Sequence, residues 1–559
     1  MSRPSARAPR RVPRPLVLAA AATLAAWPAT AEEVPAAPAE APSPAEVLIA
    51  QAAEENLVHD HLVELTETFG HRLTGSSSLT AAGEWAVERF ASWGLDARLE
   101  PWGEVPVGFE LGAQSGSISI DGGEAAALTF VTQAWTAGTD GPLTGPAVLE
   151  PVALEGFEPE RYAGAWVVRR LRDRPAAELR DELDDLLERA GMVGEVRNGG
   201  RNPAVGGRWP ESMDAVPERP STRLVQADYD KLTDALEAGS EVTLTFDLEH
   251  TFVEGPIEQY NVVADLVGSE FPDEYVIVCG HLDSWTAAVG AQDNGTGVST
   301  TLEAARLITA AGLQPRRTIR FVLWGGEEQG LLGAQAYVRE HPDVLDRTSA
   351  VLNHDNGGNY LSGISGPAAL VDDLRAVFAP VAELSEEMPF TVSENRGLSR
   401  AGMSDHAAFV QRGVPGFFWA QSGELEYRYI HHTRHDHVDQ VNLAYQEHSV
   451  VIVAVGALGI ANLDGLLDRT DLVRPARMSN RRTMGVYLDD ARVTDVIDGG
   501  KAAALGWKAG DVIVAVEGVA VGTREEIVSE LQKGEPVKTI TILRGEERLE
   551  YVFDWRRKR

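Results

Sequence analysis

Histidine and acidic residues follow three apolar segments in the middle of the chain. Apolar runs rich in β-branched residues are typical of buried parallel strands. Because the ligand site of an open α/β sheet lies beyond the carboxyl ends of its strands, these side chains should converge on one crevice. A histidine and several carboxylates in one crevice are what a divalent metal ion needs. The side chains concerned are His281, Glu327, Glu328 and Asp355.

Five candidate metal ligands are available when the adjacent loops are included. A pair of metal ions needs one carboxylate that bridges them and further ligands for each ion. A mixed nitrogen and oxygen set suits zinc, with cobalt or manganese as alternatives. Adjacent Glu327 and Glu328 cannot easily bind one ion from the same side, so one of them can ligate while the other acts as general base. The candidate ligands are His281, Asp293, Glu328, Asp355 and His432.

Two residues close to His281 bear on its chemistry. Its second ring nitrogen needs a fixed hydrogen-bond partner, and we expect Asp283 to supply it and to belong to the catalytic residues with Glu327. Cys279 is the only cysteine, which excludes an intrachain disulfide and a zinc site built from thiolates. At the end of a buried strand, Cys279 is predicted to be a buried structural thiol.

The segments that position these residues alternate between strands and helices. A helix is predicted from about Thr296 and another after Glu328. Alternating strands and helices predict an α/β fold with a doubly wound, mostly parallel sheet and helices on both faces. The predicted strands are 260–267, 275–279, 318–324 and 414–420.

Length and charge limit the remaining possibilities. The 559 residues, 44% of them hydrophobic, are enough for roughly two to four domains with sizeable cores. The formal net charge of −34 argues against nucleic acid or an anionic membrane as a partner, since both require positive patches.

The first 44 residues are predicted to be a signal peptide and a tether. Residues 1–31 contain five arginines, a short apolar core and the cleavage pattern Ala29-Thr30-Ala31. Residues 32–44 are rich in alanine and proline, as in flexible tethers. We therefore expect a secreted or periplasmic protein without a transmembrane segment.

Two further modules are predicted beside the α/β domain, which we assign to residues 45–110 and 256–465. Residues 111–255 have short strands and many prolines and glycines, which indicates an inserted, mainly β module of the protease-associated kind. Residues 468–559 resemble a PDZ domain through an alanine-rich helix followed by Lys508-Ala509-Gly510-Asp511. Such domains bind an extended peptide as an added strand, and the candidate peptide-binding loop is Met484-Gly485-Val486.

Five motifs resemble those of the co-catalytic di-zinc exopeptidase family, which includes bacterial leucyl aminopeptidases, aminopeptidase Y and the carboxypeptidase Q group. They keep the order and spacing of that family across the α/β domain. The motifs are Gly280-His281-Leu282-Asp283-Ser284, Asp293-Asn294-Gly295, Gly326-Glu327-Glu328-Gln329-Gly330, Asn353-His354-Asp355 and His432-Thr433-x-x-Asp436.

The resemblance implies a role for each metal-site residue. Asp293 would bridge two zinc ions, and the peptide bond after it, Asp293–Asn294, would be cis. His281 and Asp355 would complete one site, while Glu328 and His432 would complete the other. Glu327 would be the general base. His431 is a rival for the last position, because the family usually has a tyrosine before that histidine.

Further residues match the family pattern outside the ligand set. Arg72-Leu73-Thr74-Gly75-Ser76 is one such match. Four others are predicted to contact substrate or to support the ligands, and these are Ser404, Asp405, His406 and Asp436.

The predicted function is that of a secreted di-zinc exopeptidase acting on short peptides, with an aminopeptidase preferred. Water activated by the metals would attack the scissile carbonyl, with Glu327 as general base. The alternatives are a dipeptidase or carboxypeptidase of the carboxypeptidase Q type, a glutaminyl cyclase, and an inactive peptide-binding protein of the cell envelope. Side-chain specificity and oligomeric state stay open.

Overall fold

The computed structural model describes residues 41–556, apart from 172–174, 176–178, 475–481, 498–499 and 546. The predicted signal peptide and most of the predicted tether lie outside the described residues. Residues 1–42 and 43–559 are separate units, and all that follows concerns the second.

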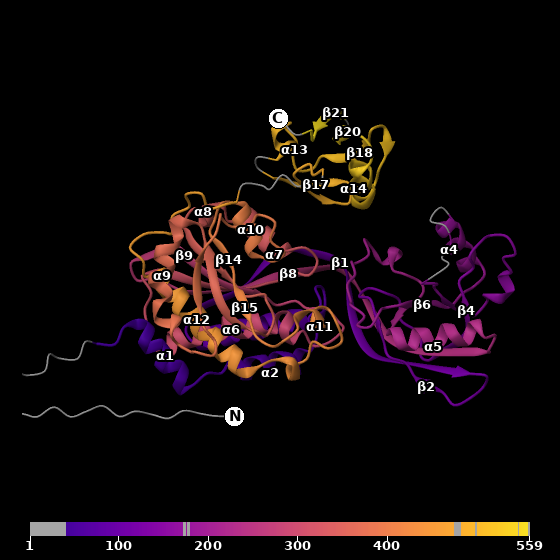
Figure 1. The fold of residues 1–559 in the computed structure, drawn as a ribbon, viewed down its shortest axis with the longest axis horizontal. Helices are drawn as coiled ribbons and strands as arrows, with labels where there is room; N and C mark the ends of the chain where they lie inside the picture. Colours follow the sequence, from indigo (N-terminus) through magenta and orange to yellow (C-terminus); the bar gives the residue numbers. More distant parts are fainter. Residues whose placement is uncertain are drawn as a thin grey trace, which may run out of the picture. The chain divides into compact units, whose positions relative to one another are not determined.

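A mixed sheet supports the candidate site (Figure 1). The strands next to the site are β1 (Asp96–Ile120), β8 (Val242–Leu266), β9 (Phe271–His281), β10 (Arg317–Trp324), β11 (Thr348–Asn353) and β14 (Gly416–Phe418). Strands β14, β11, β9 and β10 are parallel, in that spatial order, and β8 is antiparallel to β10. The predicted α/β class is confirmed, and the predicted strands 260–267, 275–279 and 318–324 correspond to parts of β8, β9 and β10. The predicted strand 414–420 is shorter than expected, because only Gly416–Phe418 pairs in this sheet and Ala420 begins a strand of another sheet.

Helices cover both faces of this sheet. One face packs against α1 (Pro44–Glu54), α2 (Val58–Phe69), α3 (Ser77–Ser92), α6 (Thr296–Ala310), α9 (Ala368–Ala382) and α12 (Leu443–Ala461). The other face packs against α7 (Leu332–Glu340), α8 (Pro342–Leu345) and α10 (His406–Gln411). Along β9, Val276 and Val278 belong to the first core, while Ile277 and Cys279 belong to the second. Side chains alternate between the faces of a strand, so a strand buried on both sides is apolar throughout.

Among the described residues, one helix, α12, is long and apolar enough to span a membrane by length and composition. Of its most apolar stretch, 72% is buried inside this protein. It packs against α1, α6 and α9. A helix that is buried to this extent and surrounded by other helices belongs to the core of the domain.

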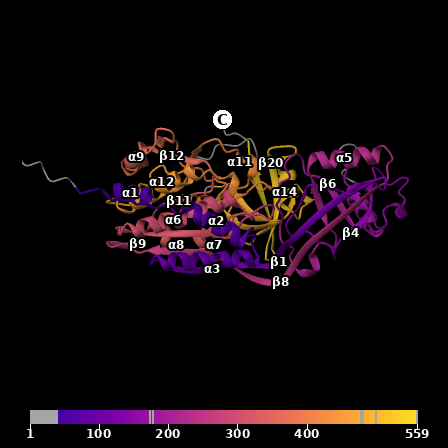
Figure 2. The ribbon, with the colours of Figure 1, turned by 90° about the horizontal axis from the view of Figure 1, so that it is seen from below.

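Two long strands carry the chain into the inserted module. Strands β1 and β8 pair along almost their whole lengths and cross the predicted module boundaries without a break (Figures 1 and 2). The module adds β2 (Ala126–Ala127), β3 (Phe130–Thr132), β4 (Leu143–Leu149), β5 (Trp166–Val168), β6 (Gly194–Asn198) and β7 (Ser221–Leu224). Neighbouring pairs in the series β4-β5-β6-β7 are parallel, and α4 (Arg180–Arg189) and α5 (Gln226–Glu237) follow β5 and β7 in the chain.

The C-terminal residues form a second sheet with its own core. Its elements are β16 (Val486–Asp489), β17 (Arg492–Val496), α13 (Lys501–Ala504), β18 (Val512–Val516), β19 (Val519–Ala520), α14 (Arg524–Gln532), β20 (Val537–Arg544) and β21 (Glu547–Asp554). The core includes Met484, Trp507, Ile527 and Phe553. A small third sheet is formed by β12 (Tyr360–Gly366), β13 (Thr391–Glu394) and β15 (Ala420–Ser422).

Candidate active site

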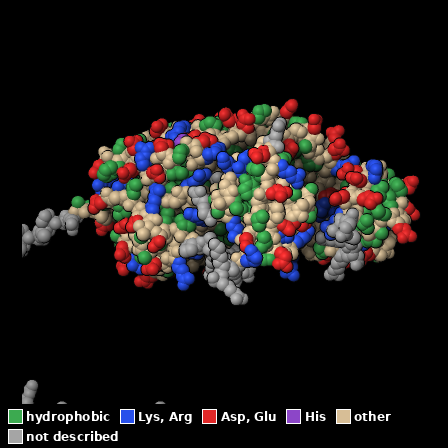
Figure 3. All heavy atoms as spheres, turned by 90° about the horizontal axis from the view of Figure 1, so that it is seen from above, with side chains coloured by type: hydrophobic (Ala, Val, Ile, Leu, Met, Phe, Trp, Pro, Cys, Tyr) green, Lys and Arg blue, Asp and Glu red, His purple; other side chains and the backbone are tan. Residues whose placement is uncertain are grey.

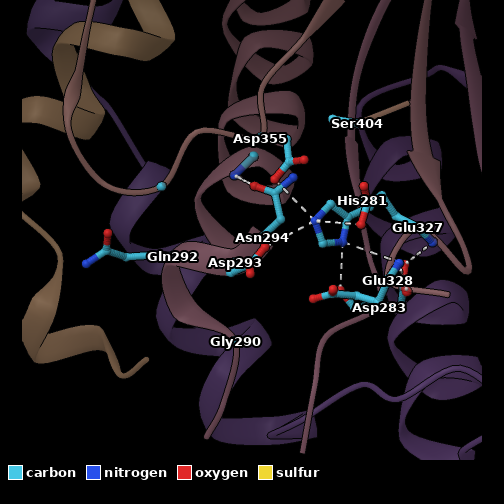
Figure 4. Close-up of polar contacts among 12 residues, drawn as sticks. His281, Asp283, Gly290, Gln292, Asp293, Asn294, Glu327, Glu328, Asp355 and Ser404 are labelled. Atoms are coloured by element: carbon cyan, nitrogen blue, oxygen red, sulfur yellow. Dashed lines mark hydrogen bonds and ion pairs between the residues drawn. The ribbon is translucent and has the colours of Figure 1, made fainter. Parts of the chain in front are cut away.

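The carboxyl ends of three neighbouring strands bring the predicted ligands together (Figure 4). His281 is the last residue of β9, Asp355 comes two residues after β11, and Glu327 comes three residues after β10. Close approach of the backbone requires glycine in the turn after β10, because a Cβ on Gly325 would lie 2.5 Å from the Tyr260 carbonyl oxygen. The strand ends therefore converge as the apolar pattern predicts.

The imidazole of His281 lies between two carboxylates. Its Nε2 is 3.3 Å from Oδ1 of Asp293 and 3.3 Å from Oδ1 of Asp355. Burial alone would lower the pKa of His281, but Asp355 and Glu327 raise it well above its usual value. The cluster of acids therefore favours a positive charge beside Nε2, which a proton or a metal cation can supply.

Asp283 supports the site in a different way from the one predicted. The Nδ1 atom of His281 lies 2.9 Å from the backbone carbonyl oxygen of Asp283, and 3.6 Å from its carboxylate. The carboxylate instead accepts hydrogen bonds from the backbone amides of Glu327 and Glu328, each at 3.1 Å. Asp283 thus fixes the turn that carries both glutamates, while its main chain orients the histidine.

Asp293 occupies the centre of the cluster. It lies in the turn Ala291–Gly295 before α6, and the Asp293–Asn294 peptide bond is cis, as expected from the resemblance. Its backbone amide donates to Asp436 at 3.0 Å, and the amide of Gln292 donates to the same carboxylate at 2.6 Å. Burial, reinforced by Asp293, raises the pKa of Asp436 to about 7. The predicted supporting role of Asp436 therefore has a concrete form, which is to hold the Asp293 turn.

His432 approaches Asp293 from the opposite side to His281. Its Nε2 lies 2.9 Å from Oε2 of Glu328 and 3.4 Å from Oδ2 of Asp293. The Nε2 atom of His431 is farther away, 3.9 Å from the same Asp293 oxygen, and the two histidine rings stack with centroids 3.7 Å apart. The geometry favours His432 over His431 as the ligand, and both remain within reach of Asp293.

The inserted module contacts the segment that carries His432. The backbone amide of Val205 donates to the carbonyl of His432 at 2.7 Å, and Nδ2 of Asn202 donates to the carbonyl of Tyr429 at 2.6 Å. Trp285 packs edge-on against the His432 ring and against Trp135 of the module. This module therefore takes part in placing one side of the site.

Glu327 is largely covered beside His281 but makes no close contact with it. Its carboxylate lies 4.0 Å from Nε2 of His281, and its side chain is 10% exposed. Burial raises the pKa of Glu327 well above its usual value, and neighbouring Asp355 adds to the effect. A carboxylate at this position can accept a proton from a water molecule at the site.

The segment Ser404–His406 lies against the second face of the sheet at the start of α10. Ser404 accepts a hydrogen bond from Nδ2 of Asn353 at 2.7 Å. Asp405 is fully buried, and neither of its carboxylate oxygens has a hydrogen-bond partner among the described residues. Burial raises the pKa of Asp405 well above its usual value and lowers the pKa of His406 to about 4.

Two residues at the site lie outside the predicted ligand set. Arg72 is fully buried and donates to the backbone carbonyls of Gly70, Leu282, Val289 and Gly290. The motif match at residues 72–76 identified this arginine in the sequence, but not its role. Tyr427 packs on the His431 ring at 5.0 Å between centroids, and burial and then Asp293 raise its pKa well above the usual value. No spacing pattern marks Tyr427 in the sequence.

The predicted peptide-binding loop is a separate site on the C-terminal module. The carbonyl oxygens of Met484 and Gly485 accept hydrogen bonds from Ala502 and Ile497. Met484 is buried in the core of this module, and Gly485 has a φ of 83°, which glycine adopts without strain. The loop therefore lies beside α13.

The residues present fit a pair of zinc ions. Two overlapping groups have ligand atoms within 4.8 Å of one another, His281 with Asp293 and Asp355, and Asp293 with His431 and His432. The Oδ2 atom of Asp293 and Oε1 of Glu328 are buried without a hydrogen bond from any described residue. Buried carboxylate oxygens without a hydrogen-bond donor, beside imidazole nitrogens, are suited to bind a cation.

Comparison with known families gives two matches. Residues 261–455 match the model of peptidase family M28, and residues 492–544 match the model of the PDZ domain. Both lie within the corresponding predicted domains, and they confirm both resemblances drawn from the motifs.

Individual relatives agree with these matches. Mouse carboxypeptidase Q is 30% identical over 259 residues, which cover 46% of this chain and 53% of that protein. The Xenopus laevis protein of the same name is 27% identical over 438 residues, which cover 74% of this chain and 88% of that protein. The chain thus spans about half the length of the mouse relative that it matches. A crystal structure of a peptidase M28 precursor from Shewanella amazonensis superimposes with a TM-score of 0.56 and 27% identity, covering 76% of this chain and 97% of that one.

Proposed function

We propose that the protein is a zinc-dependent exopeptidase that removes residues from the amino end of short peptides, a proposal supported by the match of residues 261–455 to the model of peptidase family M28. The observation that carries the proposal is the position of Asp293, which faces His281 with one carboxylate oxygen and His432 with the other. A carboxylate shared in this way between two imidazoles is suited to bridge two metal ions.

Two zinc ions would be held by overlapping sets of residues. His281, Asp293 and Asp355 would bind one ion, and Asp293, Glu328 and His432 would bind the other. Bound zinc supplies Lewis-acid catalysis and lowers the pKa of water. Glu327 would take a proton from the attacking water and return it to the leaving amine.

The charge of the site supports attack at the amino end. A free α-amino group is cationic, and the candidate site is rich in carboxylates. The buried arginine beside these acids, Arg72, donates to four backbone carbonyls and so is already engaged. A free α-carboxylate would need a cation that is not engaged in this way.

A carboxypeptidase or dipeptidase is the second candidate. The observation in its favour is the name of the mouse and Xenopus relatives, carboxypeptidase Q, together with the adjacent pair His431 and His432. The remaining alternatives from the sequence are a glutaminyl cyclase, which would leave peptide length unchanged, and an inactive peptide-binding protein.

Export and peptide capture complete the proposal. The basic start, apolar core and small-residue cleavage pattern of residues 1–31 support secretion or a periplasmic location. The PDZ domain supports a second peptide or protein ligand, since such domains bind extended peptides at a sheet edge.

Substitution of the proposed base tests the division of roles. Glu327→Ala should lower kcat by about 10²–10⁴-fold, because proton transfer by a positioned side chain contributes that much. Zinc content, measured by plasma mass spectrometry, should stay near that of the wild type. The exposed Glu386→Ala is the matched control. Loss of zinc from Glu327→Ala would show that Glu327 is a ligand and would overturn this assignment.

Digestion of defined peptides tests the end of the substrate that is attacked. Peptides blocked at either terminus are incubated with the protein, with and without a chelator, and their masses are followed. We expect successive losses from free amino ends only, abolished by the chelator and restored by zinc. Losses from the carboxyl end would establish the carboxypeptidase, and cleavage that survives complete zinc removal would contradict the metal mechanism.

A further inference from the structure

The inserted module has a basic cavity at the ends of its parallel strands. The cavity has a volume of about 260 Å³, and none of its lining residues belongs to the candidate active site. Arg169 and Arg170 follow β5, Arg197 lies near the end of β6, and Arg223 lies near the end of β7. The carboxyl ends of parallel strands are where open α/β sheets bind ligands.

The charge balance of this cavity is opposite to that of the chain. Five arginines and two acids line it, Arg169, Arg170, Arg180, Arg197 and Arg223 with Glu150 and Asp184. The whole chain has 84 acidic and 50 basic residues. On the face drawn in Figure 3, acidic and basic side chains are interspersed over the surface. A concentration of arginine in so acidic a protein indicates an attraction for anions.

Part of this positive charge is neutralised within the module. Arg169 is paired with Glu150 at 3.0 Å and with Glu195 at 2.7 Å. Arg197 is paired with Glu195 as well, at 2.6 Å. Glu195 therefore serves two arginines, and it also accepts from the Ser221 hydroxyl at 2.6 Å.

Arg223 makes no ion pair with these acids among the described residues, although Glu195 attracts it at longer range. It lies directly opposite Arg197 in the pairing of β6 with β7. Like charges on directly opposed positions of a sheet are destabilising. Burial lowers the pKa of Arg223, and Arg197 lowers it further. Within the described parts of the chain, neither Arg223 nor Arg180 forms an ion pair or a side-chain hydrogen bond.

We propose that this cavity binds a small oxyanion, either a phosphate group or the carboxylates of a small organic acid. Arg223 and Arg180 would donate to it, and Arg197 would share it with Arg223. The guanidinium fork matches the oxygens of both groups. An anion between Arg197 and Arg223 would remove the repulsion between two opposed cations.

Titration calorimetry on the full, zinc-loaded chain tests this site. Inorganic phosphate and succinate are added separately, with ionic strength held constant by chloride. We expect saturable binding of at least one of them, and the two arms distinguish phosphate from carboxylate. Arg223→Gln and Arg180→Gln should each weaken that binding by at least about tenfold, since hydrogen bonds to charged groups contribute this much.

The control removes a cation of the same module outside the cavity. Lys231 is exposed on α5, so Lys231→Gln should bind the anion as the wild type does. Arg223→Lys should bind with intermediate affinity, because lysine keeps the charge but loses the fork. Circular dichroism checks that each variant is folded. If the anion were held by the zinc ions instead, all four variants would bind it with the same affinity. That result would overturn the proposal, as would the absence of saturable binding for both anions.

Discussion

The two sides of the candidate metal centre are supported in different ways. On the first side, His281 is the last residue of a central strand, and its side chain is 1% exposed. On the second side, His432 follows the four-residue helix α11 (Tyr427–Ile430), has a φ of 58°, and is 27% exposed. Asp293 lies between them and faces both.

The comparison shows that one ligand depends on the sheet and the other on contacts between modules. His281 cannot move without disturbing β9, which is paired on both sides. The backbone around His432 is held by Val205 and Asn202 of the inserted module. We therefore expect the first metal site to tolerate changes in the module that the second does not.

Removing the residue shared by both sides should have the largest effect. Asp293→Ala deletes the proposed bridge, so both zinc ions should be lost or bound far more weakly. Activity should fall by about 10³-fold or more, because metal catalysis contributes several kcal/mol. Zinc content and kcat are measured together, with exposed Asp373→Asn as control. Full retention of two zinc ions would contradict a bridging Asp293.

Removing each of the adjacent histidines separates the ligand from its neighbour. His432→Ala should lose one zinc ion and keep the other, with activity reduced by about 10²-fold for a loss of some 3 kcal/mol. His431→Ala should keep both ions, since its Nε2 lies farther from Asp293. Zinc stoichiometry decides between them. The reverse pattern would make His431 the ligand.

A change in the inserted module should have the smallest effect, confined to the second side. Asn202→Ala removes the hydrogen bond to Tyr429, and a typical bond contributes about 0.5–1.5 kcal/mol. The affinity of the weaker zinc site should fall about 2–10-fold, without change at the stronger site. Gln226→Ala, which loses only a bond within α5, is the control. Equal weakening of both zinc sites would remove the proposed difference between the two sides.

The sequence by itself determined the parallel sheet and the residues at its strand ends. A strand buried on both faces is apolar throughout, so β9 and β10 are visible as continuous runs, and His281 and Glu327 follow them. Their convergence then follows from the common direction of parallel strands. The C-terminal domain was likewise recognisable, because its motif lies within one short segment.

Only the tertiary structure decided how these residues are held. Asp283 supports the glutamate turn with its carboxylate and His281 with its carbonyl, a choice between atoms that spacing cannot express. Arg72 binds carbonyls more than 200 residues away, at a separation of 210 to Leu282, and Asn202 binds Tyr429 at a separation of 227. Periodicity and motifs report neighbours along one element, whereas these contacts arise between elements that only packing brings together.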